Sequence, residues 1–472
     1  LVISHWSLVI GPEVRSPGVP DSRFPNPACP DVNRGVPIFP IFAPLVEKRD
    51  LISLYQTHPN IERIRAFLHE DQSKTLHLNG LLASSSPLLF AALEEDQKNT
   101  RLIMLNEREE AAYFFNDLTN LLGSQYVYYF PSSYKRSIRM QQLDKDNVML
   151  RTEVLNRMAS RNRKALVITY PEAILERVVS KKALSDHTLI LKKGEEVNLD
   201  FITEMLYEYG FERNDFVYEP GQFSVRGGII DVFSYSAEHP YRINFLGDQV
   251  DSIRSFEIET QLSIRKHASI SIVPNLNERL DQVAVQTIFD FLPDGSQLWT
   301  KDLSFCLNRL EQILKGIDVS ASSALQSLTE ASTREDDEIL DPVTFRKKLV
   351  DPEEIQKKLT EIQLIEFGQK HFFPSVKSFF FNTSMQPPFN KNFDLLKEKL
   401  IENQSDLYRN IILSDSAKQL KRLEAILNPD ETIREVKVDK IEIALHEGFY
   451  DHDLRFACFT DHQVFERYHR FK

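Results

Sequence analysis

The sequence predicts an α/β protein in which a domain with a parallel sheet is joined to a smaller, β-rich domain. Between about residue 50 and residue 195, short apolar runs alternate with amphipathic stretches. This is the pattern of strands that are connected by helices. Residues 241–245 alternate between apolar and polar side chains, which indicates a strand with one buried and one solvated face. Residues 393–459 return to the alternation of helical and extended patterns.

The composition favours a multidomain globular protein that binds other proteins. The chain has 472 residues, of which 42% are hydrophobic, and this length suits two to four domains with a core each. Its formal net charge is −12, whereas proteins that grip phosphates need an excess of Lys and Arg. Residues 201–266 contain six basic and eleven acidic side chains. We therefore expect a protein partner for this segment.

The cysteines and the hydropathy pattern predict a cytoplasmic protein without a membrane partner. Cys29, Cys306 and Cys458 are far apart in sequence, and so sparse a set fits neither a disulfide framework nor a CxxC metal site. No run of 18 apolar residues occurs, and the first 30 residues lack the pattern of a signal peptide.

The first 48 residues are expected to form an irregular, proline-rich arm. Residues 1–44 hold nine of the 23 prolines, and prolines at this density remove backbone donors and block helices and central strands. The chain begins with Leu1 rather than Met, so a non-native leader is the alternative interpretation.

Residues 49–195 are predicted to form the parallel-sheet domain. Helical periodicity covers residues 51–55 and 61–68, and strands are expected at residues 75–79, 102–105, 127–130 and 165–169. The last of these strands is followed by Tyr170, Pro171 and Glu172. This is not the acidic pair that would hold Mg²⁺ in an ATPase, and it is typical of the first turn of a helix.

Residues 196–275 are predicted to form the β-rich domain. A helix over residues 199–210 precedes a strand over residues 225–233, in which paired glycines at 227 and 228 relieve a kink or bulge. Residues 241–250 are expected to form the partner strand. Its solvated face would carry Arg242 and Asn244, joined by Arg226 and Gln222 from the neighbouring strand.

Two further segments complete the chain. Residues 276–384 are predicted to be a helical or mixed flanking subdomain, in which a charged stretch over residues 334–363 forms the solvated side of ordinary helices. Residues 385–472 are predicted to form a small α/β domain. It contains His446, His452, Asp453 and His462, which lack the spacing of a metal motif. We therefore expect no metal site.

Two long segments carry a family resemblance. The segments EPGQFSVRGGIIDVF and PYRINFLGDQVDSIRSFEIETQLS resemble the small β-rich domain shared by UvrB and the bacterial transcription-repair coupling factors, which docks onto UvrA in both families. The segment EPGQFSVRGGI resembles the coupling factors more than it resembles UvrB. The segment LHEGFYDHDLRFACFTDHQVFERYHRFK resembles the part of the coupling factors that precedes their polymerase-binding domain. The resemblance covers residues 50–472 and is strongest over 196–275 and 445–472.

The resemblance implies a domain organisation and a set of binding residues. Residues 49–195 would be a degenerate RecA-like, P-loop-like domain, with the UvrA-binding domain inserted after it. Where UvrB has an arginine two positions before the one in VRG, this chain has Ser224, so one charged contact would be lost. The residues that would face UvrA are Arg213, Gln222, Arg226, Asp231, Phe233, Arg242 and Asn244.

The resemblance also indicates where a nucleotide would bind. A phosphate-binding loop needs glycines, a Lys for the phosphate charge and a Ser or Thr hydroxyl for Mg²⁺. At the corresponding position, Gly80 matches, but the second glycine, the Lys and the hydroxyl residue are replaced by Ser85, Ser86 and Pro87. We expect neither a cofactor site nor catalytic residues in this chain.

The expected function is recruitment of UvrA. By resemblance, the chain is the N-terminal part of a coupling factor whose full form is an ATP- and Mg²⁺-dependent DNA translocase that displaces stalled RNA polymerase. RNA polymerase and DNA would bind through parts that are missing from this chain. One alternative is a UvrB-type excision-repair ATPase, which the altered loop disfavours. The other is a DNA-binding module, which the acidic balance disfavours.

Overall fold

The computed structural model describes residues 44, 46–70, 75–94, 99–135, 143–159, 164–280, 283–327, 342–373, 377–429 and 436–467. The proline-rich arm, apart from Pro44 and residues 46–48, lies outside these residues, as do Cys29, residues 334–341 of the charged stretch and residues 468–472.

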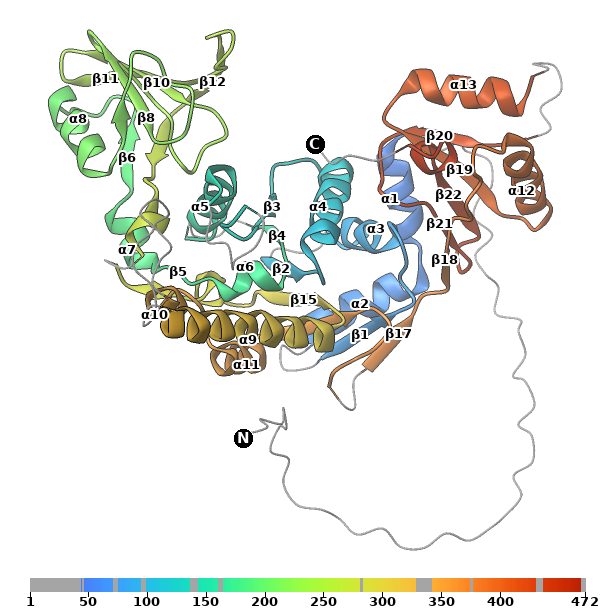
Figure 1. Ribbon diagram of the computed structural model, residues 1–472. Helices are drawn as coiled ribbons and strands as arrows, with labels where there is room; N and C mark the ends of the chain where they lie inside the picture. The colour runs from blue at the N-terminus through green and yellow to red at the C-terminus, as the bar shows by residue number, and fades with distance from the viewer. Residues whose placement is uncertain are drawn as a thin grey trace, which may run out of the picture. The chain divides into compact units, whose positions relative to one another are not determined.

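A seven-stranded parallel sheet forms the centre of the largest domain (Figure 1). This sheet confirms the predicted α/β class, and all four strands expected from residues 75–169 belong to it. Its strands are in the order β17 (Lys377–Phe380), β1 (Leu76–Asn79), β16 (Gln363–Phe367), β15 (Gln297–Lys301), β2 (Arg101–Met104), β4 (Leu166–Thr169) and β3 (Val127–Tyr129).

Three strands of this sheet come from the segment that was expected to flank it. The segment 276–384 supplies β15, β16 and β17, and β15 and β16 lie between β1 and β2. Parallel strands need long crossover connections, so strands that are neighbours in the sheet can be far apart in sequence. The long helix α9 (Leu303–Ser327) and α11 (Pro352–Glu361) lie between β15 and β16 in the chain.

Helices cover the central sheet and share a large apolar core with it. The core includes Trp299 of β15, which is fully buried, and it continues into the strands of the C-terminal domain. Pro171 and Glu172 open a helix as predicted, with the proline in its first turn. The remaining helices of this part are α1 (Lys48–Gln56), α2 (Pro59–Glu70), α3 (Ser85–Ala92), α4 (Arg108–Leu122), α5 (Lys145–Ala159), α6 (Pro171–Leu175), α7 (Lys181–Asp186) and α10 (Pro342–Lys347).

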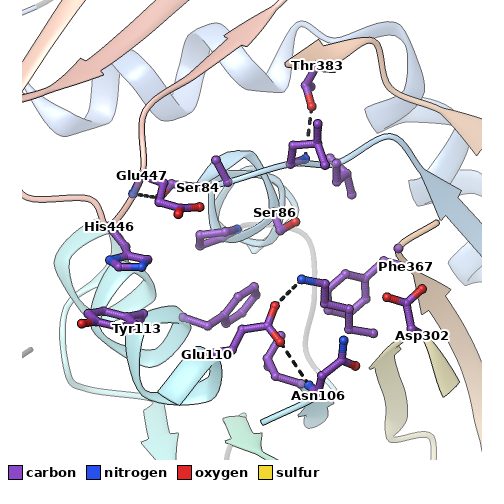
Figure 2. Close-up of a pocket in the computed structure, with 18 of the residues that line it drawn as sticks. Ser84, Ser86, Asn106, Glu110, Tyr113, Asp302, Phe367, Thr383, His446 and Glu447 are labelled. Carbon is purple, nitrogen blue, oxygen red and sulfur yellow. Dashed lines mark hydrogen bonds and ion pairs between the residues drawn. The ribbon is translucent and has the colours of Figure 1, made fainter. Parts of the chain in front are cut away.

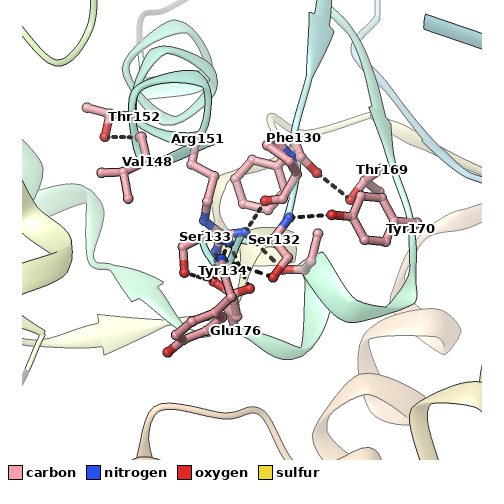
Figure 3. A network of polar contacts seen from close by, with 12 residues as sticks. Phe130, Ser132, Ser133, Tyr134, Val148, Arg151, Thr152, Thr169, Tyr170 and Glu176 are labelled. Carbon is pink, nitrogen blue, oxygen red and sulfur yellow. Dashed lines mark hydrogen bonds and ion pairs between the residues drawn. The ribbon is translucent and has the colours of Figure 1, made fainter. Parts of the chain in front are cut away.

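A buried polar network fixes the loop that follows β3 (Figure 3). The Glu176 carboxylate accepts hydrogen bonds from the backbone N–H of Ser133 at 3.0 Å and lies 3.5 Å from the guanidinium of Arg151. Arg151 also donates to the carbonyl oxygen of Pro131 at 2.7 Å and stacks on the ring of Phe130. The network therefore holds this loop against α5 and α6.

A six-stranded sheet forms the β-rich domain (Figure 1). All of its pairings are antiparallel except that of β7 with β8. Its strands are in the order β12 (Ser263–His267), β11 (Gln249–Phe256), β10 (Tyr241–Leu246), β9 (Ile229–Val232), β8 (Gln222–Arg226) and β7 (Glu212–Arg213). Helix α8 (Leu199–Glu208) packs on one face of this sheet. The strands β6 (Leu189–Lys192) and β13 (Ser269–Ile272), which come before and after these elements in the chain, pair antiparallel with each other.

Two sequence predictions for this domain were wrong in detail. The paired glycines do not kink a single strand, because they form the tight turn between β8 and β9, where Gly227 has a φ of +59°. The expected single strand over residues 241–250 is a hairpin of β10 and β11, which turns at Gly247. In both cases the apolar pattern continues through the turn, so periodicity alone does not reveal the reversal.

The C-terminal part is a small α/β domain, as predicted. Its five-stranded sheet has the order β18 (Thr383–Met385), β21 (Phe449–Asp451), β22 (Phe456–Thr460), β19 (Arg409–Ser414) and β20 (Asp439–Glu442). Its helices are α12 (Phe393–Ser405), α13 (Ala417–Leu427) and α14 (Asp461–Val464). Elsewhere, the short strands β5 (Val178–Val179) and β14 (Val285–Gln286) pair with each other.

In the part of the chain that the structure describes, no helix has the length and apolar character needed to cross a membrane.

Candidate protein-interaction site

The sheet of the β-rich domain has one buried face and one open face. On the buried face, Phe223, Ile230 and Ile243 pack against Ile202 and Leu206 of α8. Side chains alternate along each strand, so the residues between these apolar positions lie on the opposite face. The pairing register places Ser224, Asp231 and Arg242 in one row and Arg226, Ile229 and Asn244 in the next. We call this polar surface the open face.

Asp231 is the centre of the open face. Its carboxylate is 2% exposed and accepts hydrogen bonds from Nε and Nη2 of Arg242 at 2.7 and 2.9 Å. It also pairs with Nη2 of Arg226, whose side chain is 42% exposed. The hydrogen bond to Asp231 raises the pKa of Arg242 above its usual value. Asp231 therefore holds two guanidinium groups side by side at the surface.

The seven residues expected to face UvrA do not all lie together. Arg226, Asp231 and Arg242 are in contact, and Asn244 follows Arg242 on the same face. The side chain of Gln222 instead accepts hydrogen bonds from the backbone N–H groups of residues 218 and 219.

The other two expected residues lie elsewhere. Phe233 is 4% exposed, so the chain itself covers its ring. Arg213 is exposed on the edge strand β7, where its register with Phe223 places it on the other side of the sheet from Arg226.

Two aromatic residues on the loop before β8 extend the open face. Phe216 and Tyr218 are 47% and 59% exposed, and their ring centroids are 6.3 Å apart. The guanidinium of Arg226 lies 5.3 Å from the centre of the Phe216 ring. The hydroxyl of Ser224 donates to the carbonyl oxygen of Asp215 at 2.9 Å, which ties this loop to β8.

Sequence reasoning missed both aromatics because they lie outside any periodic stretch. Their signal was the composition of the loop, since exposed aromatic side chains beside arginines are enriched at protein interfaces.

The loop over residues 80–84, which was compared above with a phosphate-binding loop, lines a separate cleft of about 830 Å³ (Figure 2). β1 leads through a loop into α3, and Gly80 has a φ of +86° at the start of the loop. The strand, loop and helix order that the resemblance implies is thus present, and positions 86 and 87 are Ser and Pro. The lining carries six carboxylates, those of Glu107, Glu109, Glu110, Asp117, Asp302 and Glu447.

The basic side chains that line the cleft are engaged within the protein. Lys301 is paired with Glu110, and the ring of His446 stacks on Tyr113 with centroids 3.5 Å apart. A nucleoside triphosphate would meet an excess of like charge in this cleft.

The loop is also held by the C-terminal domain. The Ser84 hydroxyl donates to Asp117 at 2.6 Å and accepts from the backbone N–H of Glu447 at 3.0 Å. The other oxygen of Asp117 accepts from the backbone N–H of His446 at 2.8 Å. Burial raises the pKa of Asp117 to about 7, against the effect of these hydrogen bonds.

The histidines near the C-terminus take part in hydrogen bonds within the protein. His452 contacts the hydroxyls of Tyr408 and Ser384 at 2.7 and 2.9 Å, and His462 contacts the carbonyl oxygen of His446 at 2.6 Å. Asp453 instead lies 3.1 Å from Nε2 of His58, which belongs to the chain far upstream.

Among the described residues, His58, Asp451 and Asp453 form a group compact enough for a metal ion. However, Nδ1 of His58 accepts the backbone N–H of Asn60 at 3.1 Å, so the proton of the neutral ring lies on Nε2 and is donated to Asp453. The nitrogen that would face a metal therefore has no free lone pair, and these residues do not fit a metal site.

Comparison with known proteins identifies the β-rich domain. Residues 189–277 match the family model of the UvrB interaction domain. This match includes the open face and both strands of the β6 and β13 pair.

Transcription-repair-coupling factors from several bacteria are similar to this chain. The protein of Bacillus subtilis is 31% identical over 208 residues, which is 44% of this chain and 17% of the relative. That of Rickettsia typhi is 30% identical over 173 residues, with 37% of this chain and 15% of the relative covered. That of Escherichia coli is 28% identical over 141 residues, with 30% and 12% covered.

The chain spans less than a fifth of the length of these relatives. The matched segment of the β-rich domain and the similarity to these proteins confirm the resemblance expected from the sequence. The chain carries a UvrB interaction domain and is a relative of the transcription-repair-coupling factors.

Proposed function

We propose that this chain binds UvrA through the open face of its β-rich domain and so brings UvrA to a larger repair assembly. The observation that carries the proposal is the pair of surface guanidinium groups of Arg226 and Arg242 on the buried Asp231, inside the segment that matches the UvrB interaction domain. Arginine suits this role because its planar fork binds carboxylates bidentately and loses little hydration. Asp231 acts as a positioning residue, since its own carboxylate is covered.

We further propose that the chain is part of a transcription-repair coupling factor. The relatives are named for that activity, and the whole protein would act on stalled RNA polymerase and DNA, in the cytoplasm, with ATP and Mg²⁺ bound by a motor outside this chain. The present chain would be the recruiting part. The cleft at the altered loop would then be a structural remnant without ATPase activity, because its lining is acidic and lacks the phosphate-binding Lys.

Competition with UvrB tests this function. UvrB carries the domain type that the matched family model describes, so the chain and UvrB would occupy the same surface of UvrA. Adding the 472-residue chain to a preformed complex of UvrA with labelled UvrB should displace UvrB. An Arg226→Ala/Arg242→Ala variant should displace it far less, because each guanidinium would contribute to the contact.

The same samples separate recruitment from the alternatives. A ternary complex of UvrA, UvrB and the chain, or displacement that is equal for both proteins, would contradict the proposal. Turnover of ATP by the purified chain would favour the UvrB-type ATPase instead.

A further inference from the structure

The open face carries more positive charge than Arg226 and Arg242. The strand register places Arg242 of β10 directly opposite Arg254 of β11, and Arg254 directly opposite Lys266 of β12. Because paired residues lie on one face of a sheet, these three cations form a line that continues from Asp231. We call Arg242, Arg254 and Lys266 the cationic row.

This arrangement is costly for the isolated domain. Like charges directly opposite each other destabilise a sheet, and the one carboxylate in line with them, Asp231, is already bound to Arg226 and Arg242. No ion pair within the described residues involves Arg254 or Lys266, and Nε of Arg254 is buried without a hydrogen-bond partner. The row therefore has an excess of positive charge.

Other polar atoms on the same face are also unsatisfied. Asn244 and Ser252 are opposite each other on β10 and β11, two residues along from the Arg242 and Arg254 pair and so on the same face. Oδ1 of Asn244 and Oγ of Ser252 are buried without partners within the described chain. Buried polar atoms are normally paired in folded proteins. The open face thus has polar atoms and charges that the chain itself does not satisfy.

We infer that the cationic row receives carboxylates from an acidic patch of UvrA, so that the binding surface extends across β11 and β12 as well as β8 to β10. This inference rests on the proposed function and deepens it. Charge complementarity supports a protein occupant, because the same segment is acidic overall, with eleven acidic and six basic side chains between residues 201 and 266, and would repel a long polyphosphate. Neighbouring strands are about 4.8 Å apart, so the cationic row spans only two interstrand distances. This length suits contact with a few carboxylates of a protein better than contact along a DNA duplex.

Two adjacent residues of β12 provide a matched test. Lys266 is in the cationic row, whereas Arg265 pairs with Ser255 and lies on the opposite face. Both are exposed, so Lys266→Glu and Arg265→Glu make the same change of charge one residue apart. In the full chain, titrated with UvrA, K266E should weaken the affinity by about tenfold and reduce its dependence on salt. R265E should change the affinity by less than about twofold.

The stability of the variants keeps this result interpretable. Glu at position 266 would face Arg254 and replace a repulsive pair by an attractive one. K266E should therefore have a melting temperature equal to or above that of the wild-type chain while it binds UvrA more weakly. A weaker affinity that came with a lower melting temperature would count against a direct contact.

The outcomes distinguish this inference from the proposed function. If the wild-type chain binds UvrA and K266E and R265E weaken it equally, the cationic row is not part of the contact and only the inference fails. If the wild-type chain does not bind UvrA, the proposed function fails and the inference with it. Binding of a short DNA duplex that K266E abolishes, with UvrA affinity unchanged, would assign the row to nucleic acid and overturn the inference.

Discussion

Asp231 illustrates how one buried acid can determine an exposed surface. The two guanidinium groups that it binds are the groups we propose for contact with UvrA, yet the carboxylate itself is covered. The sequence predicted Arg226 and Asp231 among the residues that would face UvrA, but it did not predict the ion pair between them. That ion pair depends on the β8 and β9 pairing, which brings the side chains of residues 226 and 231 together.

Replacing Asp231 by Asn should disorder both arginines. An amide cannot balance two guanidinium groups, and loss of one partner of a largely buried ion pair costs about 2 kcal/mol or more even when the arginines are partly exposed. Hydrogen exchange of the β9 and β10 amides should accelerate accordingly, and UvrA affinity should fall. Asp251→Asn, at an exposed position of β11, is the control. If D231N had the same amide exchange rates and the same affinity for UvrA as the wild type, the proposed role of Asp231 would be refuted.

Asp117 should make stability depend on pH. Its pKa is raised to about 7 in the folded chain from an ordinary value of 3.8. Between these values the unfolded state loses the proton while the folded state keeps it, so the free energy of unfolding falls as pH rises from about 4 to 7 and then levels off.

An Asp117→Asn variant should lack this component, because Asn resembles the protonated acid. Relative to the wild type, its stability should therefore increase with pH over that window, by about 4 kcal/mol in total, because one pKa unit corresponds to about 1.4 kcal/mol. Chemical denaturation of both proteins at pH 4.5, 6 and 7.5 would measure the difference. A difference that is constant with pH would show that Asp117 is already ionised in the folded chain.

The hairpin of β8 and β9 shows which elements the sequence could predict. Alternating side chains at residues 241–245 identified β10 and its buried face, because burial against α8 imposes that pattern. β8 and β9 were expected as one strand. The position of the turn was missed, since a pair of glycines is compatible with a bulge as well as with a reversal. The positive φ of Gly227 decides between them.

Substitution of Gly227 should loosen this hairpin. Val is β-branched and strained at positive φ, so Gly227→Val should cost about 1–2 kcal/mol, whereas Gly227→Asn should cost only a few tenths, because Asn tolerates this conformation. Hydrogen exchange of the β8 and β9 amides would report both changes. Equal protection in the Val and Asn variants would mean that the turn can adopt another conformation without strain.

At the scale of the whole molecule, two features of the described residues could not be predicted from any local pattern. In the central sheet, β15 and β16 lie side by side between β1 and β2, although α9 and α11 separate β15 from β16 in the chain. The backbone of residues 446–447 binds Ser84 and Asp117 across more than 300 residues of sequence. Periodicity identifies strands but not the strands with which they pair. Hydrogen bonds from backbone N–H groups cannot be predicted from side-chain types, because every residue except proline has such a group. The absence of a Lys from residues 81–87, by contrast, can be read directly from the sequence, because a phosphate-binding loop requires that particular side chain.

Calorimetric titration of UvrA with the intact chain is the most direct test of recruitment through the open face. The wild-type chain should bind with one-site stoichiometry. Arg226→Ala should weaken the affinity by about thirtyfold, as expected for an interface hot spot worth about 2 kcal/mol, whereas Arg265→Ala on the other face of the sheet should bind like the wild type. Equal affinities of the wild-type chain and R226A, or no heat of binding for any of the three, would contradict the account.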